Sequence, residues 1–306
     1  MAVSLNLTVG ISGELSLGHA GFMSVGAFSG IIMSGWLLNA FQMENETMRL
    51  VLAMLAGGVC AAIAGVLIGI PVLRLRGDYL AIITLGFGEI IRVILTNIDS
   101  VIGKDFTYGA AGLKRIPKYS SFTLVFICVV VSCYIIHTIM KSRHGRAILS
   151  IREDEIASES VGVQTTYYKT FAFVVSAMLA GIAGCLYAGY IGSLYPSTFK
   201  FMKSIEILVM VVLGGMGSML GSILSATVLT ILPEATRSFD SYRMVIYSLV
   251  LILMMIFRPG GLLGSYDFSM SRIVEKAMNG ELFRKHTKKE ATDPCLLYTS
   301  PSPRDY

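Results

Sequence analysis

Long apolar runs separated by short polar breaks restrict most strongly how this chain can fold. They cover Leu17–Phe41, Leu50–Leu73, Asp78–Asn97, Phe122–Met140, Tyr167–Ile191, Ile205–Leu232 and Met244–Phe257. A helix needs about 20 mainly apolar residues to cross a bilayer. Charged residues make up 15% of the 306 positions, against about 25% in soluble proteins. The sequence therefore predicts an all-α, polytopic transmembrane helical bundle, placed in the cell membrane as a multi-pass protein.

Charge and cysteine patterns exclude several other classes of function. The net charge is only +5, and the basic residues lie beside apolar runs, where they set membrane orientation and do not indicate nucleic-acid binding. Four of the five cysteines lie inside apolar runs without C-x-x-C spacing, so neither a disulfide framework nor a metal site is expected. The chain also lacks a G-x-x-x-x-G-K-[ST] phosphate loop, an H-E-x-x-H motif and a G-x-S-x-G motif. We expect no catalytic residue, no metal and no ATP site in this chain.

The longest polar run between two apolar runs is KSRHGRAILSIREDEIASESVG, residues 141–162. It has no proline, and Ala147, Ile148 and Ile151 interrupt its charges at helical spacing, which predicts a short amphipathic helix outside the membrane. Such a helix is suited to docking a soluble partner. The alternative is a solvated loop whose basic residues only fix topology.

Residues Ile205–Leu232 are too many for a simple crossing, and glycines interrupt them near the middle, at Gly214, Gly215 and Gly217. If the basic loops at 74–76 and 141–152 are cytoplasmic, this run must enter and leave on the same face. We therefore predict a re-entrant hairpin of two half-helices, which is tolerated only where the backbone is buried in protein or lines a cavity. The alternative is one tilted helix.

Charged residues also occur within the third apolar run. Glu89 and Arg92 share a helix face, just after Gly86 and Gly88. We interpret these four residues, together with the glycines at 214–217, as part of a translocation path with helix breaks. The competing interpretation is a neutralised ion pair that locks two helices together. Glu14 and His19, at the start of the first run, line an aqueous entrance or sit at the membrane interface.

The ends of the chain differ from its centre. Residues 5–11 resemble the tail of an earlier helix, which suggests a longer natural protein. We assign 1–265 to the transmembrane domain, 266–294 to a polar cytoplasmic tail and 295–306, where composition shifts abruptly, to a sequencing or assembly artefact.

Several stretches in one order carry a family resemblance. NLTVGISGELSLGHAGFMSVGAF, RLRGDYLAIITLGFGEIIRVILTN, SRHGRAILSIREDEIASESVG, SIEILVMVVLGGMGSMLGSILSA and RPGGLLG together resemble the LivM-type membrane permease subunit of branched-chain amino acid ABC importers. The resemblance covers about residues 5–265.

This resemblance implies a set of partners and a role for the charged segment. The implied partners are a LivH-type second permease, two cytoplasmic ATPases that bind ATP and Mg, and a periplasmic amino-acid-binding protein, in the bacterial inner membrane. The segment would dock on the ATPases through an E-x-A then Gly pattern at Glu155, Ala157 and Gly162. The other polar positions assigned to this coupling are Arg146, Arg152, Glu153 and Asp154.

The function expected from these features is ATP-driven import of branched-chain or related amino acids by alternating access. Permeases of similar pattern move urea and short amides, so that substrate class is an alternative. A passive channel or an ion-coupled transporter would share the broken helices but would not need the polar segment at 141–162. An intramembrane enzyme lacks its expected motifs.

Overall fold

The computed structural model describes residues 1–41, 46–75, 77–102, 107–114, 116, 120–235, 248–249, 251–252, 256–257 and 261. The chain divides into two units, Met1–Tyr266 and Asp267–Tyr306, and the second lies outside the described residues. The predicted tail at 266–294 and the predicted artefact at 295–306 both lie outside the described residues. Of the predicted run 244–257 only six positions are described, and the following description concerns the first unit alone.

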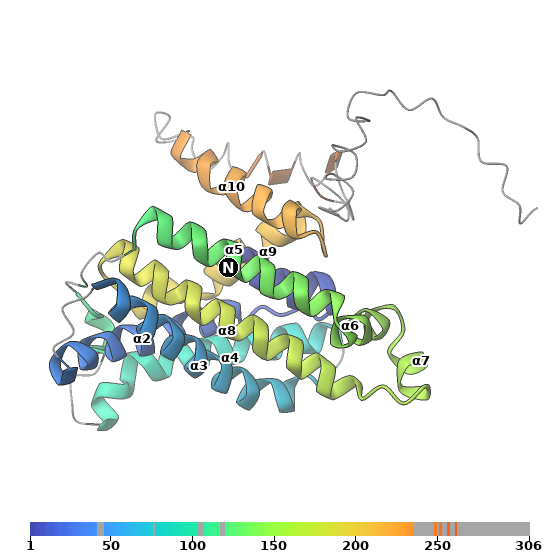
Figure 1. Ribbon diagram of the computed structural model, residues 1–306, viewed down its shortest axis with the longest axis horizontal. Helices are drawn as coiled ribbons and strands as arrows, with labels where there is room; N and C mark the ends of the chain where they lie inside the picture. The colour runs from blue at the N-terminus through green and yellow to red at the C-terminus, as the bar shows by residue number, and fades with distance from the viewer. Residues whose placement is uncertain are drawn as a thin grey trace, which may run out of the picture. The chain divides into compact units, whose positions relative to one another are not determined.

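The first unit is mainly helical over its described residues, as the apolar runs predict (Figure 1). Its long helices are α2 (His19–Phe41), α3 (Glu46–Val72), α4 (Asp78–Ile102), α5 (Phe122–Lys141) and α8 (Thr165–Ile191). These five are long and apolar enough to cross a membrane. Each matches its predicted run to within a few residues, so the prediction of a polytopic helical membrane protein is confirmed.

Glycines allow α2, α3 and α8 to form the centre of the bundle. Gly26, Gly57 and Gly181 meet where the three helices cross, and a Cβ on Gly57 would lie 2.6 Å from the carbonyl oxygen of Gly26. Such close backbone approach is how helices gain packing contacts in lipid, where no hydrophobic drive brings them together. Phe22 and Phe173 pack edge to face beside this crossing, with ring centroids 5.3 Å apart.

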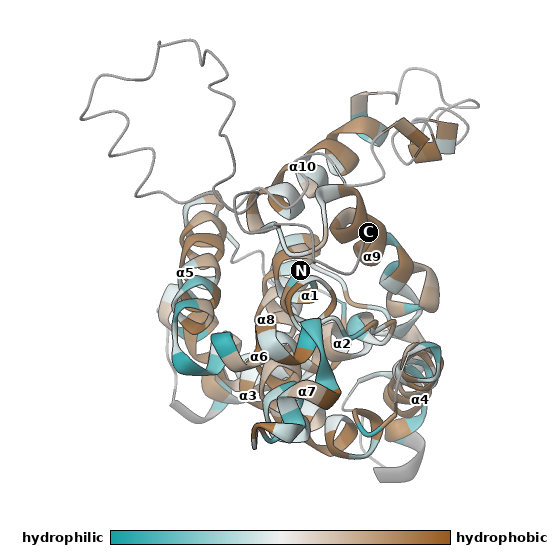
Figure 2. Ribbon diagram, turned by 90° about the vertical axis from the view of Figure 1, so that its right-hand side faces the viewer, coloured by the Kyte–Doolittle hydropathy of each residue, from teal (hydrophilic) through white to brown (hydrophobic). Residues whose placement is uncertain are grey.

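The outer surface of the bundle is strongly apolar (Figure 2). On α5, Phe122, Phe126, Val130 and Tyr134 follow each other at i, i+4 spacing, and each exposes more than half of its surface. A soluble protein rarely exposes apolar area of this extent, whereas a lipid-facing helix requires it. The described cysteines are free thiols within helices, as the sequence predicts.

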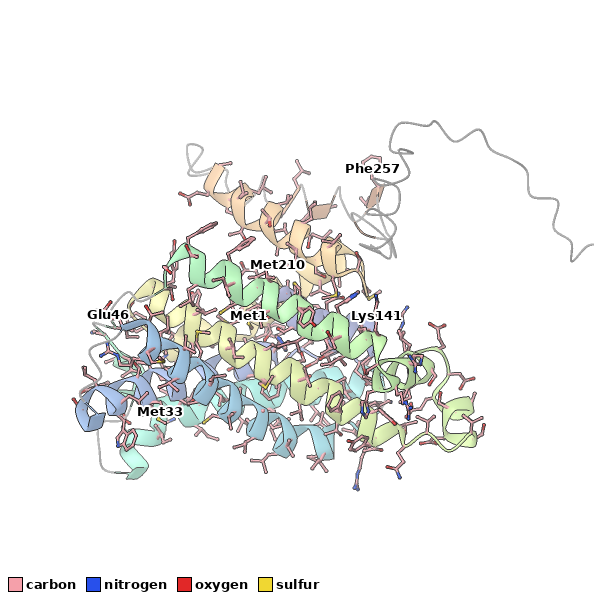
Figure 3. The ribbon with its side chains drawn as sticks, in the orientation of Figure 1. Met1, Met33, Glu46, Lys141, Met210 and Phe257 are labelled. Atoms are coloured by element: carbon pink, nitrogen blue, oxygen red, sulfur yellow. The ribbon has the colours of Figure 1, made fainter. Side chains whose placement is uncertain are left out.

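Short helices complete the unit. The N-terminal α1 (Ala2–Asn6) continues as a π-helix, η1 (Leu7–Ile11), and the chain then runs without helical structure from residue 13 to 18 before α2. Figure 3 labels Met1 in the middle of the bundle. The 3₁₀ turn η2 (Gly109–Ala111) leads to a β-bridge between Leu113 and Leu194, which ties the α4–α5 connection to the end of α8, just before η3 (Pro196–Phe199).

The run 205–232 forms two antiparallel helices, α9 (Phe201–Gly214) and α10 (Met219–Ala235). Gly214 touches Gly221, and the Ser225 hydroxyl donates to the Met210 carbonyl. At 1.5 Å per residue these helices are roughly 21 Å and 25 Å long, short of a bilayer core of about 30 Å. The prediction of two half-helices joined at the glycines is confirmed, and the single tilted helix is wrong.

Candidate functional site

The polar segment at 141–162 forms two helices, not the single helix expected from its sequence. They are α6 (Arg143–Glu153) and α7 (Glu155–Ser160), separated by an extended Asp154. The Asp154 carboxylate accepts hydrogen bonds from the amides of Ile156 and Ala157 at 2.9 and 3.0 Å. Aspartate is a strong helix N-cap, so Asp154 starts a new helix where continuous helical periodicity was predicted.

The first of these helices is anchored to the bundle. Ile148 is buried against Ile11 and other apolar side chains of η1, α5 and α8, and Ile151 is also buried. The opposite face of α6, which includes Arg146 and Glu153, is exposed. The helix therefore has the amphipathic character that its sequence predicts, and it lies at the end of the bundle where α5 ends and α8 begins, beside the labelled Lys141 (Figure 3).

The second helix is exposed and carries apolar residues at its tip. Ile156 and Val161 expose 71% and 78% of their surface, and Ala157 is also exposed. Gly162 ends the helix in the left-handed region, at φ 86°, a conformation that glycine adopts without steric cost. An open pocket beside α7 is lined by Glu159, Gln164, Thr165, Tyr167, Ile70 and neighbouring residues.

A buried ammonium group joins α7 to the interior. Lys169 Nζ lies 2.7 Å from Glu14 Oε1 and 3.0 Å from Glu155 Oε1. The Lys169 side chain is 5% exposed and that of Glu14 is 11% exposed. Glu14 is therefore covered by contacts with α8 and the polar segment, and its place at an aqueous entrance or at the membrane interface stays a prediction.

Arg152 makes a second connection between the polar segment and the interior. Its Nη1 donates to the carbonyl oxygen of Gly10, in η1, at 2.9 Å. This carbonyl is available because the π-helix ends at the next residue and leaves its last acceptors without helical partners. Of the residues predicted to couple to a partner, Arg152 is thus also an interior contact.

Beside Arg152, the π-helix η1 meets the turn between α9 and α10. Gly10 touches Gly217, in the turn between α9 and α10, and the Asn6 side-chain oxygen accepts from the Gly217 amide at 2.9 Å. Gly215 and Gly217 both have positive φ, 100° and 89°, which explains why glycines stand at this turn. We call Asn6, Gly10, Arg152 and Gly217 the glycine junction.

The predicted break near Gly86 and Gly88 is wrong, because α4 is continuous through both residues. Gly88 instead lies against Gly18 and Gly21, where α4 crosses the start of α2. The actual second interruption is at 13–18, where glycine and polar residues precede α2. Gly86 faces open space, in an exposed stripe of α4 with Tyr79, Ile82, Ile90, Val93 and Asn97.

Glu89 and Arg92 form the predicted ion pair, with 2.6 Å between Arg92 Nε and Glu89 Oε2. The other carboxylate oxygen of Glu89 accepts from the Phe201 amide, at the start of α9, at 3.0 Å. A negative charge at a helix N-terminus is favourable. This contact ties α4 to α9, and both side chains keep about a third of their surface exposed. His19 is buried and hydrogen-bonds Ser4 at 2.9 Å, so its side chain points into the bundle, and its position relative to the membrane interface stays a prediction.

Sequence reasoning missed Lys169, Asn6 and Gly10. The available signal for Lys169 was a lone cation five residues into an apolar helix, which is costly in a membrane unless paired. Among the residues that the structure describes, no group of His, Cys, Asp and Glu is arranged to hold a metal ion.

A bundle of apolar helices with a hairpin of two half-helices and a polar segment at one end fits the class of polytopic membrane permeases. The family model described as "Branched-chain amino acid transport system / permease component" matches residues 1–258. The chain belongs to this family of branched-chain amino acid transport permeases.

Curated relatives agree with this assignment. The LivM permease proteins of the high-affinity branched-chain amino acid transport systems are similar, that of Salmonella typhimurium at 39% identity (86% of this chain, 67% of the relative). The Escherichia coli LivM protein is 37% identical (92% of this chain, 69% of the relative). The Escherichia coli LivH permease is 31% identical over 40% of each chain. No solved structure matches this chain significantly.

Proposed function

We propose that this permease is the membrane-spanning subunit of an ATP-driven importer of branched-chain or related amino acids in the bacterial inner membrane. Its partners would be a LivH-type permease, two cytoplasmic ATPases that hold ATP and Mg, and a periplasmic amino-acid-binding protein. The similarity to LivM and LivH supports the transport class. The observation that carries the ATP-driven mechanism is the exposed helix α7 and its connections to the interior. Its first residue, Glu155, is tied through Lys169 to the segment at 13–18, and the nearby Arg152 is tied to the glycine junction.

The tip of α7 has the features of a docking surface. Exposed Ile156, Ala157 and Val161 stand among acidic residues beside an open pocket. Apolar groups at the centre of a patch supply binding energy, while charges around them select the partner and its orientation. In this proposal Glu153, Asp154 and Arg146 are such surrounding charges.

The translocation path in this proposal follows α4 and the hairpin. Gly86 opens a notch in the exposed stripe of α4, and Glu89 and Arg92 are partly exposed one turn further on. A zwitterionic amino acid would pass between this stripe and the second permease, and then the turn at Gly214, Gly215 and Gly217. The Gly217 amide donates to Asn6 and the Gly215 amide to the Val212 carbonyl, so in this proposal a change in the turn's conformation releases these groups to bind a carboxylate or an ammonium.

Transport by alternating access would follow from movement at the two interruptions. Closure of the ATPases moves α7, and the glycine turn and the segment at 13–18 change conformation because they lack continuous helical hydrogen bonds. The rigid crossing of α2, α3 and α8 stays in place. ATP hydrolysis then restores the starting state.

Reconstituted vesicles that contain this chain and all partners test the proposal. Radiolabelled leucine should accumulate only when ATP is enclosed on the cytoplasmic side. Unlabelled isoleucine and valine should compete, whereas inhibition by urea or acetamide alone would assign the chain to the alternative substrate class. Leucine flux without ATP would contradict the proposal and favour a passive or ion-coupled transporter.

A further inference from the structure

The segment at 13–18, between η1 and α2, lacks helical structure, and Gly18 at its end packs closely against Thr84 and Gly88. The Glu14 amide donates to the Thr8 carbonyl at 3.0 Å, and the Leu17 amide donates to the Thr84 hydroxyl at 3.0 Å. Its charged contact is the Glu14 carboxylate on Lys169. A backbone without continuous helical hydrogen bonds can rearrange at lower cost than a helix, and the Glu14–Lys169 pair is the charged contact that fixes the first half of this segment.

Lys169 joins two separate segments of the chain from a position on α8. It stands in the second turn of α8, a helix that the glycine crossing locks to α2 and α3. On one side it contacts Glu14, and on the other it contacts Glu155, the first residue of α7. Two carboxylates on different segments therefore share one buried ammonium group.

Buried ion pairs of this kind contribute little net stability compared with apolar side chains of the same volume, although removal of one partner is costly. An apolar trio at 14, 155 and 169 would hold the fold equally well. The charges give something that apolar packing does not, because displacement of Glu155 removes its attraction for Lys169 and its repulsion of Glu14, and both effects act over several ångströms.

We propose that Glu14 and Lys169 are positioning residues for coupled transport, and that they transmit movement of α7 to the interrupted helix at 13–18. This inference rests on the proposed function, because it takes α7 to be the ATPase-facing helix. When a partner displaces α7, the Glu155 carboxylate moves away from Lys169. Of the two carboxylates that contact the Lys169 ammonium group, only that of Glu14 then remains in place. Arg152, which joins α6 to Gly10, carries the same movement to the glycine junction.

The diagnostic variant is Glu14→Gln in the complete reconstituted complex. It keeps the side-chain shape, removes the charge and leaves the Lys169–Glu155 pair in place. Glu14 lies beneath the polar segment and outside the docking tip, so assembly with the ATPases and their ATP hydrolysis should be retained. Leucine transported per ATP hydrolysed should fall about tenfold, within the usual range of coupling between sites.

Two further variants separate positioning from packing. Glu14→Asp restores the charge and should recover most of the transport per ATP. Glu206→Gln removes the same charge from an exposed pair within α9, where Lys203 lies 2.9 Å away, and should leave the ratio unchanged. If Glu14→Gln does not assemble, Glu155→Gln gives the same readout with the buried Lys169–Glu14 pair intact.

An unchanged ratio in Glu14→Gln, or an equal loss in Glu206→Gln, would overturn the inference. Failure of the proposed function reads differently, because the unaltered complex would then show no ATP-dependent uptake. In that case thiol labelling of Ser16→Cys, in a background without other cysteines, still decides. The Glu155→Gln change should alter the labelling rate of Ser16→Cys when residue 14 is glutamate, and should not alter it in the Glu14→Gln background. An equal response in both backgrounds would refute the link.

Discussion

Lys169 and Glu14 form an ion pair inside the bundle, with 2.7 Å between Nζ and Oε1. Lys169→Met would leave Glu14 and Glu155 facing each other without a cation. We expect this variant to lower the free energy of unfolding by about 3–5 kcal/mol, the usual cost of removing one partner of a buried pair. Denaturant or thermal unfolding of the detergent-solubilised protein measures the change.

Lys203→Met is the matched control for that measurement. Lys203 pairs with Glu206 on the same helix, and both side chains are partly exposed. Surface pairs contribute about 0–1 kcal/mol, so this variant should stay close to the unaltered protein. Equal destabilisation by both substitutions would show that the buried position of Lys169 has no special role in stability.

The crossing of α2, α3 and α8 should not tolerate a methyl group. A Cβ on Gly26 would overlap the backbone of Gly181, whereas a Cβ on Gly35, further along α2, has no neighbour within 4 Å. Gly26→Ala should destabilise the protein by at least about 1–3 kcal/mol through overpacking. Gly35→Ala should be neutral or stabilising by up to about 1 kcal/mol. Yield of folded protein and unfolding temperature distinguish the two outcomes.

The start of α7 depends on the Asp154 side chain. Asp154→Ala removes the acceptor for two backbone amides and should cost about 0.5–2 kcal/mol locally. Hydrogen exchange at Ile156 and Ala157 should accelerate by a corresponding factor. Asp154→Asn keeps an acceptor oxygen and should retain most of the protection. Unchanged exchange in the alanine variant would mean that tertiary contacts alone hold α7.

The antiparallel order of α9 and α10 places both outer ends of the hairpin on the same side. Single cysteines at Lys200 and Glu234, in a background without other cysteines, should react with an impermeant thiol reagent from the periplasmic side. A cysteine at Arg146, on the exposed face of α6, should react from the cytoplasm. Labelling of 200 and 234 from opposite sides would contradict the re-entrant hairpin.

Hydrophobic length and glycine position predicted the helices well. The five long helices follow apolar runs because burial of the backbone in lipid leaves few alternatives to a helix. The hairpin at 201–235 was predictable since its length did not fit one crossing and its glycines marked the turn. The division of the polar segment at Asp154 was not predicted. Its apolar residues keep helical spacing across Asp154, but the capping side chain starts a new helix there.

Contacts between distant segments were not predictable from the sequence. Glu14 and Lys169 each look like an isolated charge and Glu155 is one of several charges in the polar segment, and only the packing of α7 and α8 against the segment at 13–18 brings the three together. Gly86 and Gly88 were predicted to mark a helix break, although glycine within a helix can equally allow close packing of two helices. Gly88 has this second role, because it packs against Gly18. Glycine content alone does not distinguish these two roles.

The bend at Asp154 separates two helices of the polar segment that differ in how they contact the bundle. The apolar face of α6 is committed to the bundle through Ile148 and Ile151, whereas the outward face of α7 is not. Substitution of Ile156 or Ala157 should therefore leave the packing of the membrane domain unchanged, whereas Glu159 accepts a hydrogen bond from the Thr165 hydroxyl, at the start of α8, at 2.8 Å. If α7 is the ATPase-facing helix, as proposed, one membrane scaffold can be matched to a different motor by substitutions at a few exposed positions of α7.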